Sequence, residues 1–198
     1  MKSLRLVLSI VLMSLTVVFA QSGAQKPVAL ADSQKPVALA DAQGPVALTD
    51  AQKSFNQLKK LAGTWEGRVS TVPPQAAIEG KPMQVSLRVT SMGNALMHEM
   101  TGAGRPDDPI TMLYLEGDRL LLTHYCDAGN RPRMEAKASP EGKKVEFDFL
   151  DVAGSTKYGH MHSSVFTFID ANHHTEDWAF MVKGDKQVRA HVDLQRTK

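Results

Sequence analysis

Two histidines near the C-terminus have the spacing of metal ligands. His160 and His162 stand two residues apart in a segment that alternates like a β-strand. Both rings are therefore expected on one face, about 6.5–7 Å apart at their base. Strand-borne ligands of zinc and copper use this spacing, and His191, Glu176 or Asp177 could complete the ligand shell. The alternative is that these histidines are solvated, at the surface or at loop ends, because the sequence does not place a third ligand.

A second pair, His124 and Cys126, suggests a thiol that a neighbouring base activates. Their spacing points both side chains to one face of a strand but holds them too far apart for a direct hydrogen bond. No oxyanion-hole motif accompanies them. Cys126 is the single cysteine of the chain and is better explained as a small buried hydrophobe. The sequence therefore favours a protein without enzymatic activity.

Two arginines follow a turn and could recognise an anionic head group. Arg131 and Arg133 come directly after the turn at 127–130, and guanidinium groups bind carboxylates and other anions through charged hydrogen bonds. His124 and Tyr125 on the preceding strand are the nearest polar companions, one on each face. Ordinary hairpin construction explains the Asp, Gly and Asn of this turn equally well.

The elements that must position these residues begin with one short helix. Thr49 and Gln52 match the two partners of a capping box. The apolar stripe that follows consists of Phe55, Leu58 and Leu61. We expect the helix to run from about Asp50 to Ala62, because Gly63 can end it in a left-handed conformation.

From Thr64 onward the apolar period changes to two and turn signals recur, as in an all-β fold. The expected strands are Thr64–Thr71, Met83–Ser91, Ala95–Gly102, Ile110–Glu116, Arg119–Cys126, Arg131–Ala138, Lys144–Asp151, His160–Ile169, His174–Val182 and Gln187–Arg196. Short loops join them, so sequential antiparallel hairpins follow. Closure of the last strand on the first removes both exposed edges. The sequence predicts a ten-stranded antiparallel up-and-down β-barrel with one short N-terminal helix.

The tripeptide Gly63-Thr64-Trp65, just after the helix, resembles the Gly-x-Trp signature of the calycin superfamily: lipocalins, fatty-acid-binding proteins and nitrobindin-like barrels. The segment 115–134 is also similar to a stretch of exported bacterial lipocalin-like proteins of unknown function. The resemblance implies that the Trp looks inward at a closed end of the barrel, with Arg189 or Arg196 against it. It further implies an interior that holds a small hydrophobic or amphipathic molecule. The ligand-binding candidates are Trp65, His124, Tyr125, Asn130, Arg131, Arg133 and Trp178.

The resemblance to nitrobindin-like barrels also implies haem as an alternative cofactor. In those barrels a His near the end of the barrel binds iron from inside, and His191 occupies a comparable place. His191 faces the interior only if the polar face of its strand lines the cavity. The simpler interpretation puts the apolar face inside and leaves His191 in solvent.

The N-terminus has the pattern of an export signal. Residues 1–20 carry Lys2 and Arg5, an apolar run and a small-residue cleavage site. Residues 21–48 hold three copies of a nine-residue unit with Pro at a fixed position, which we interpret as a disordered spacer. The barrel domain is expected at 49–198. The apolar run is too short to span a membrane, so the mature protein is expected in the periplasm or outside the cell, with no transmembrane segment.

Charge argues against a polyanionic partner. The 23 Lys and Arg residues nearly balance the 21 Asp and Glu residues, and loss of Lys2 and Arg5 makes the numbers equal. Nucleic acid is therefore not expected as a partner. Three hypotheses remain: a non-enzymatic barrel without a cofactor that binds a small apolar or amphipathic ligand, a zinc, copper or haem protein that uses the C-terminal histidines, and a structural or interaction domain of the cell envelope.

Overall fold

The computed structural model describes residues 47–103, 108–137, 141–182, 184 and 186–198, which belong to one compact unit. The predicted export signal and nearly all of the predicted spacer lie outside the described residues. Chain order starts with helix α1 (Asp50–Lys59). Among the described residues, no helix has the length and apolar character needed to cross a membrane.

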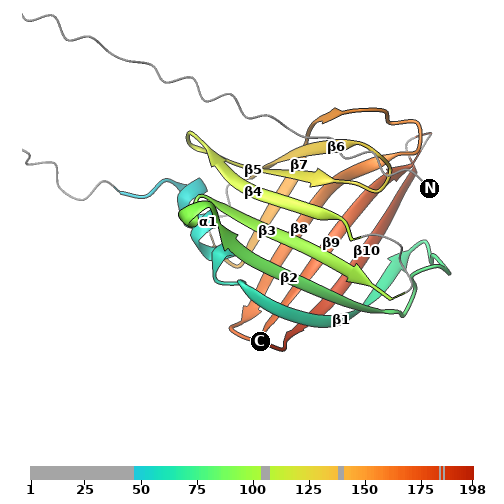
Figure 1. The fold of residues 1–198 in the computed structure, drawn as a ribbon, viewed down its shortest axis with the longest axis horizontal. Coiled ribbons are helices and arrows are strands. Elements are labelled where there is room, and N and C mark those ends of the chain that lie inside the picture. The colour runs from blue at the N-terminus through green and yellow to red at the C-terminus, as the bar shows by residue number, and fades with distance from the viewer. Residues whose placement is uncertain (1–46, 104–107, 138–140, 183, 185) are drawn as a thin grey trace, which may run out of the picture. The chain divides into compact units, whose positions relative to one another are not determined.

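Ten strands follow the helix, as predicted (Figure 1). They are β1 (Gly63–Val72), β2 (Pro82–Thr90), β3 (Ala95–Gly102), β4 (Ile110–Glu116), β5 (Arg119–Tyr125), β6 (Arg131–Ala136), β7 (Lys144–Ala153), β8 (His160–Asp170), β9 (His173–Val182) and β10 (Lys186–Arg196), with a short 3-10 turn, η1 (Ser91–Gly93), between β2 and β3. Each strand pairs antiparallel with its neighbour in sequence, and β1 also pairs with β10. The sheet therefore closes into a barrel, which confirms the predicted fold class.

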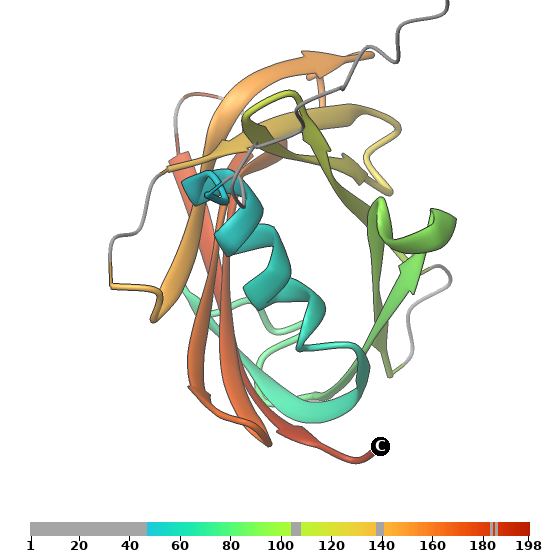
Figure 2. The same ribbon diagram turned by 90° about the vertical axis from the view of Figure 1, so that its left-hand side faces the viewer.

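Helix α1 closes one end of this barrel (Figure 2). Its capping box forms as predicted, because the Thr49 side chain accepts from the Gln52 backbone N–H while the Gln52 side chain accepts from the Thr49 N–H. The apolar stripe faces inward: Phe55, Leu58 and Leu61 are all buried. The helix contacts β2, β4 and β5, so its apolar face completes the core at this end.

The helix ends at Lys59, three residues before the predicted end at Ala62. The backbone tightens here, because Leu61 and Ala62 donate to the carbonyls of the residues three positions earlier. Gly63 then begins β1 with φ +143°, where a Cβ atom would lie 2.4 Å from the Arg196 side chain and from the Lys198 carbonyl oxygen. Only glycine fits this junction between helix and barrel.

The signature tryptophan lies inside the closed end, as the calycin resemblance implied. Trp65 is fully buried and its indole N–H donates to the Leu61 carbonyl at 2.8 Å. Of the two arginines considered, Arg196 is the one against it, with the guanidinium 4.0 Å from the ring centroid. Arg196 also donates to the carbonyls of Lys60, Ala62 and Ala171. This one side chain therefore joins the helix to the last strand.

Candidate functional site

The half of the barrel away from α1 contains a cavity of about 330 Å³. Its walls come mainly from the strand ends that lie opposite the helix. The apolar lining residues are Val69, Ile78, Met83, Met100, Pro109, Met161, Trp178, Phe180, Val182, Val188, Ala190 and Val192. The polar ones are Gln75, His124, Cys126 and Asp127. The volume lies at the lower end of the range for small-molecule sites, about 300–1,000 Å³.

Side-chain size helps to explain the space in this half. Near α1 the interior positions carry large, fully buried residues such as Trp65, Phe166 and Leu96. Toward the opposite end the interior positions of β10 carry Val188 and Ala190. Small inward residues at these positions leave space inside the barrel.

The cavity is floored by Trp178 and His124, whose ring centroids lie 5.7 Å apart. His124 is 2% exposed, and its Nδ1 lies 2.8 Å from the hydroxyl oxygen of Thr111, which is itself fully buried. This hydrogen bond fixes the orientation of the imidazole. The wall therefore holds an oriented imidazole beside the polar side chains of Gln75, Cys126 and Asp127 in a largely apolar surface.

Below Trp178, three N–H donors converge on one carboxylate. Glu176 lies 2.9 Å from Nε2 of His98, 3.1 Å from Nε2 of His174 and 3.0 Å from Nε1 of Trp178. Both histidines and the glutamate are fully buried. We call these four residues the buried quartet. Because Glu176 accepts the indole N–H, the quartet fixes the orientation of the Trp178 ring at the cavity floor.

The quartet keeps Glu176 ionised inside the barrel. Burial alone raises the pKa of a carboxyl group, but the charge of His98 and the hydrogen bonds from His174 and His98 outweigh it. The pKa of Glu176 therefore lies well below its usual value. A buried carboxylate with three donors is a strong acceptor, and its removal leaves those donors without a partner.

The structure places the predicted ligand-binding residues in different environments. His124 and Trp178 line the cavity, whereas Trp65 packs under it against the edge of His174, with ring centroids 4.2 Å apart. Asn130 is buried and donates to the carbonyls of Ser155 and Gly159, so it anchors a loop.

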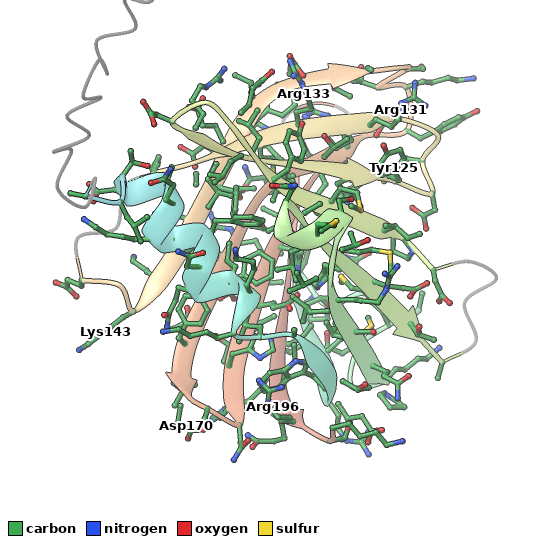
Figure 3. All side chains as sticks on the ribbon, turned by 60° about the vertical axis from the view of Figure 1, so that its left-hand side comes forward. Tyr125, Arg131, Arg133, Lys143, Asp170 and Arg196 are labelled. Atoms are coloured by element: carbon green, nitrogen blue, oxygen red, sulfur yellow. The ribbon has the colours of Figure 1, made fainter. Side chains whose placement is uncertain are left out.

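The predicted anion-binding arginines are on the outer surface of the barrel (Figure 3). Arg133 pairs with Asp151, an exposed ion pair that lowers the pKa of Asp151 through a hydrogen bond and charge. Arg131 and the exposed Tyr125 line a shallow outer groove instead of the cavity. The reason is strand alternation, since Pro132 and Met134 occupy the inward positions of β6. These arginines do not form the rim of the cavity.

The three predicted metal ligands are not brought together. His160 and His162 lie side by side, with Nε2 of His160 3.4 Å from Nδ1 of His162. Burial lowers the pKa of His160, and the charge of His162 adds to this effect. His191 instead lies on the outer surface with its Nδ1 2.7 Å from Asp177, so it does not face the interior as a haem ligand would. In the described part of the chain, no three His, Cys, Asp or Glu side chains form a metal-binding group.

His98, His174 and Thr111 belong to the site but were not among the residues predicted from the sequence. The alternation of β9 contains a signal, since His174, Glu176 and Trp178 share one face with the aromatic Phe180. A face that mixes aromatic and ionisable residues indicates a buried polar network. The partner His98 lies 78 residues away in sequence on β3, and no local pattern predicts that meeting.

Comparison with known proteins supports the fold alone. No protein-family model matches the chain, and no curated protein matches it. A solved structure of a protein of unknown function from the DUF3598 family of Nostoc punctiforme is similar, with TM-score 0.51 and 15% identity, over 71% of this chain and 48% of that one. Rv2717c from M. tuberculosis is similar with TM-score 0.51 and 13% identity, over 73% of this chain and 98% of that one. The chain thus spans about half of the Nostoc protein.

Proposed function

We propose that this chain is an exported, non-enzymatic binding protein that holds a small apolar or amphipathic molecule in the cavity opposite α1. The observation that carries the proposal is the 330 Å³ cavity with a largely apolar lining. Transfer of an apolar molecule into such a space is favourable because it removes apolar surface from water. The calycin resemblance of Gly63-Thr64-Trp65 and the export pattern of residues 1–20 support the same proposal.

The lining favours a ligand with one polar end. The polar lining residues are Gln75, His124, Cys126 and Asp127, and Thr111 orients the imidazole of His124 at the floor. Three methionines, Met83, Met100 and Met161, adapt their side chains to ligands of different shape. We therefore expect the barrel to accept a class of compact molecules that share an apolar body and a polar end.

The direct test is native mass spectrometry of the full chain purified from its own cellular compartment. A retained ligand gives a mass increment that disappears on denaturation. Absorbance of the same sample separates the haem hypothesis, because haem gives a Soret band and an apolar metabolite does not. A Soret band would replace the present proposal with a haem protein.

A matched pair of variants locates the binding site. Ala190→Phe adds a ring inside the cavity, whereas Ser70→Phe adds the same ring at an exposed outward position on β1. Titration with the fluorescent apolar probe N-phenyl-1-naphthylamine should show at least about tenfold weaker binding for Ala190→Phe. Binding to Ser70→Phe should match the unmodified chain. Equal binding by all three proteins, or none by the unmodified chain, contradicts an interior site.

A further inference from the structure

The seam between β7 and β8 brings two imidazoles together outside the cavity. Pairing of these strands runs only from Lys144 opposite Thr167 to Asp148 opposite Ser163, although both strands continue beyond it. On its other side, β8 shifts register against β9 between Met161 and Ser163. His162 is the extra residue of this bulge, so its side chain departs from regular alternation.

The ring of Phe149 on β7 holds both histidines at this seam. His162 stacks on it with an interplanar angle of 17° and centroids 5.0 Å apart. His160 contacts the same ring, with centroids 4.8 Å apart. The two imidazoles are half-buried and meet at 66°. Their orientation is thus fixed by packing, and their facing nitrogens are Nε2 of His160 and Nδ1 of His162.

The separation of these nitrogens, 3.4 Å, distinguishes between two kinds of contact. A direct hydrogen bond from an N–H donor spans about 2.7–3.2 Å, so the observed separation is long for one. Two imidazoles on one tetrahedral zinc ion, each about 2.0–2.1 Å from the metal, have nitrogens about 3.3–3.4 Å apart. Adjacent ligands at a right angle, as in square-planar or octahedral sites, stand only about 2.9 Å apart.

We propose that Nε2 of His160 and Nδ1 of His162 chelate a divalent zinc ion at the seam of β7 and β8. The described residues supply two ligands, so the other coordination positions are open to water or to a small anionic ligand from solution. Such an ion exchanges readily, unlike a structural zinc enclosed by four protein ligands. The site is separate from the cavity proposal and stands without it.

Two other histidines provide matched controls. His173 lies 2.9 Å from Asp193, and His191 lies 2.7 Å from Asp177, each as one imidazole beside one exposed carboxylate. Each pair also offers two donor groups to a metal ion. Comparison with these pairs therefore tests whether zinc binding requires the geometry of His160 and His162 or only an exposed histidine.

The test is a zinc titration of the full chain without an affinity tag, against a chromogenic zinc chelator. One zinc ion should bind, and His160→Gln or His162→Gln should weaken it by about tenfold or more, the effect expected when a metal site loses an interaction that holds it together. His173→Gln and His191→Gln should bind as the unmodified chain does. Circular dichroism checks the fold of each variant.

A second measurement decides the question if the variants do not fold. Proton NMR of the unmodified chain during the titration should shift the imidazole signals of His160 and His162 and leave those of His173 and His191 in place. No zinc binding by the unmodified chain overturns the proposal. So do undiminished binding in folded His160→Gln and His162→Gln, and NMR shifts at His173 or His191 in place of the seam.

Discussion

In the half of the barrel that α1 covers, Trp65, Phe166 and Leu96 are fully buried and the space between the walls is filled. In the opposite half, the same strands enclose a cavity of about 330 Å³. Helix α1 adds Phe55, Leu58 and Leu61 to the core of the half that it covers, whereas small inward side chains such as Ala190 border the space in the other half. A closed barrel of this size therefore permits a filled core or a void, and the sequence decides which forms at each level.

The two halves also differ in how they treat polar groups. The filled half contains an ionised carboxylate, Glu176, whose oxygens accept from three buried donors. The cavity half has the oriented pair of Thr111 and His124 at the boundary. The hydrogen bonds to Glu176 orient the side chains of this core, and Nδ1 of His98 and of His174 is left buried without a hydrogen-bond partner. A polar group on a cavity wall can instead contact a ligand. If the cavity binds a ligand as proposed, stability and binding depend on different halves of the barrel.

The largest expected effect on stability comes from replacing a phenylalanine with alanine, and the two halves should respond differently to this change. Phe166→Ala removes a fully buried ring that packs on Phe147, His98 and Trp178, and it should lower the free energy of unfolding by about 3–5 kcal/mol. Phe180→Ala removes a half-buried ring that already borders the cavity. It should cost about 1–2 kcal/mol.

Urea denaturation measures both changes. The affinity for the fluorescent probe should change in the opposite order. Phe180 borders the cavity, so Phe180→Ala should change the affinity more than Phe166→Ala, because Phe166 does not line the cavity. Equal losses of stability for the two variants would show that the halves are packed alike.

A smaller effect is expected from acid, which acts on the filled half through Glu176. The pKa of Glu176 is lower in the folded protein than in the unfolded chain, because His98 and His174 outweigh the effect of burial. Its contribution to stability is therefore complete above the unfolded value, near pH 4.3, and is lost as the pH falls below it. In that range one such group gives a slope of about 1.4 kcal/mol per pH unit.

The control for this prediction is Glu176→Gln, which has no charge to titrate. The exposed carboxyls Glu135 and Asp151 also have lowered pKa values, but their contribution is common to both proteins and cancels. Urea denaturation should be measured between about pH 3 and pH 5, the range in which ordinary carboxyl groups titrate. The free energy of unfolding should fall less steeply with decreasing pH in the variant. Parallel slopes would mean that Glu176 is not the titrating group.

The sequence predicted the fold well because local chemistry determines it. Turn residues and a period of two located all ten strands, and the capping box at Thr49 located the start of α1. The calycin resemblance implied either Arg189 or Arg196 against Trp65, and the structure selects Arg196. These features depend on residues near one another in sequence or on a recurrent motif.

The candidate site was predicted less well, because it depends on which residues of strands far apart in sequence face each other across the barrel interior. His98 and Glu176 lie on β3 and β9, which are not neighbours in the sheet, so their contact crosses the interior. The bulge at His162 likewise has no signal in the sequence. The outward position of Arg131 and Arg133, by contrast, could have been predicted. The alternation of β6 in the sequence already puts the apolar Pro132 and Met134 inside.

The smallest expected effect concerns the helix that closes the filled half. Thr49→Ala removes the side chain that accepts from the Gln52 N–H at 3.2 Å, and loss of such a cap costs about 1 kcal/mol. Lys53→Ala, which removes an exposed ion pair with Asp50, should change stability by about 0.5 kcal/mol or less. Hydrogen exchange should show faster opening of α1 in Thr49→Ala only, with probe affinity unchanged. If the probe affinity of Thr49→Ala fell together with the stability of the helix, the two halves would be coupled through the barrel wall. Ligand binding would then depend on the packing of the filled half.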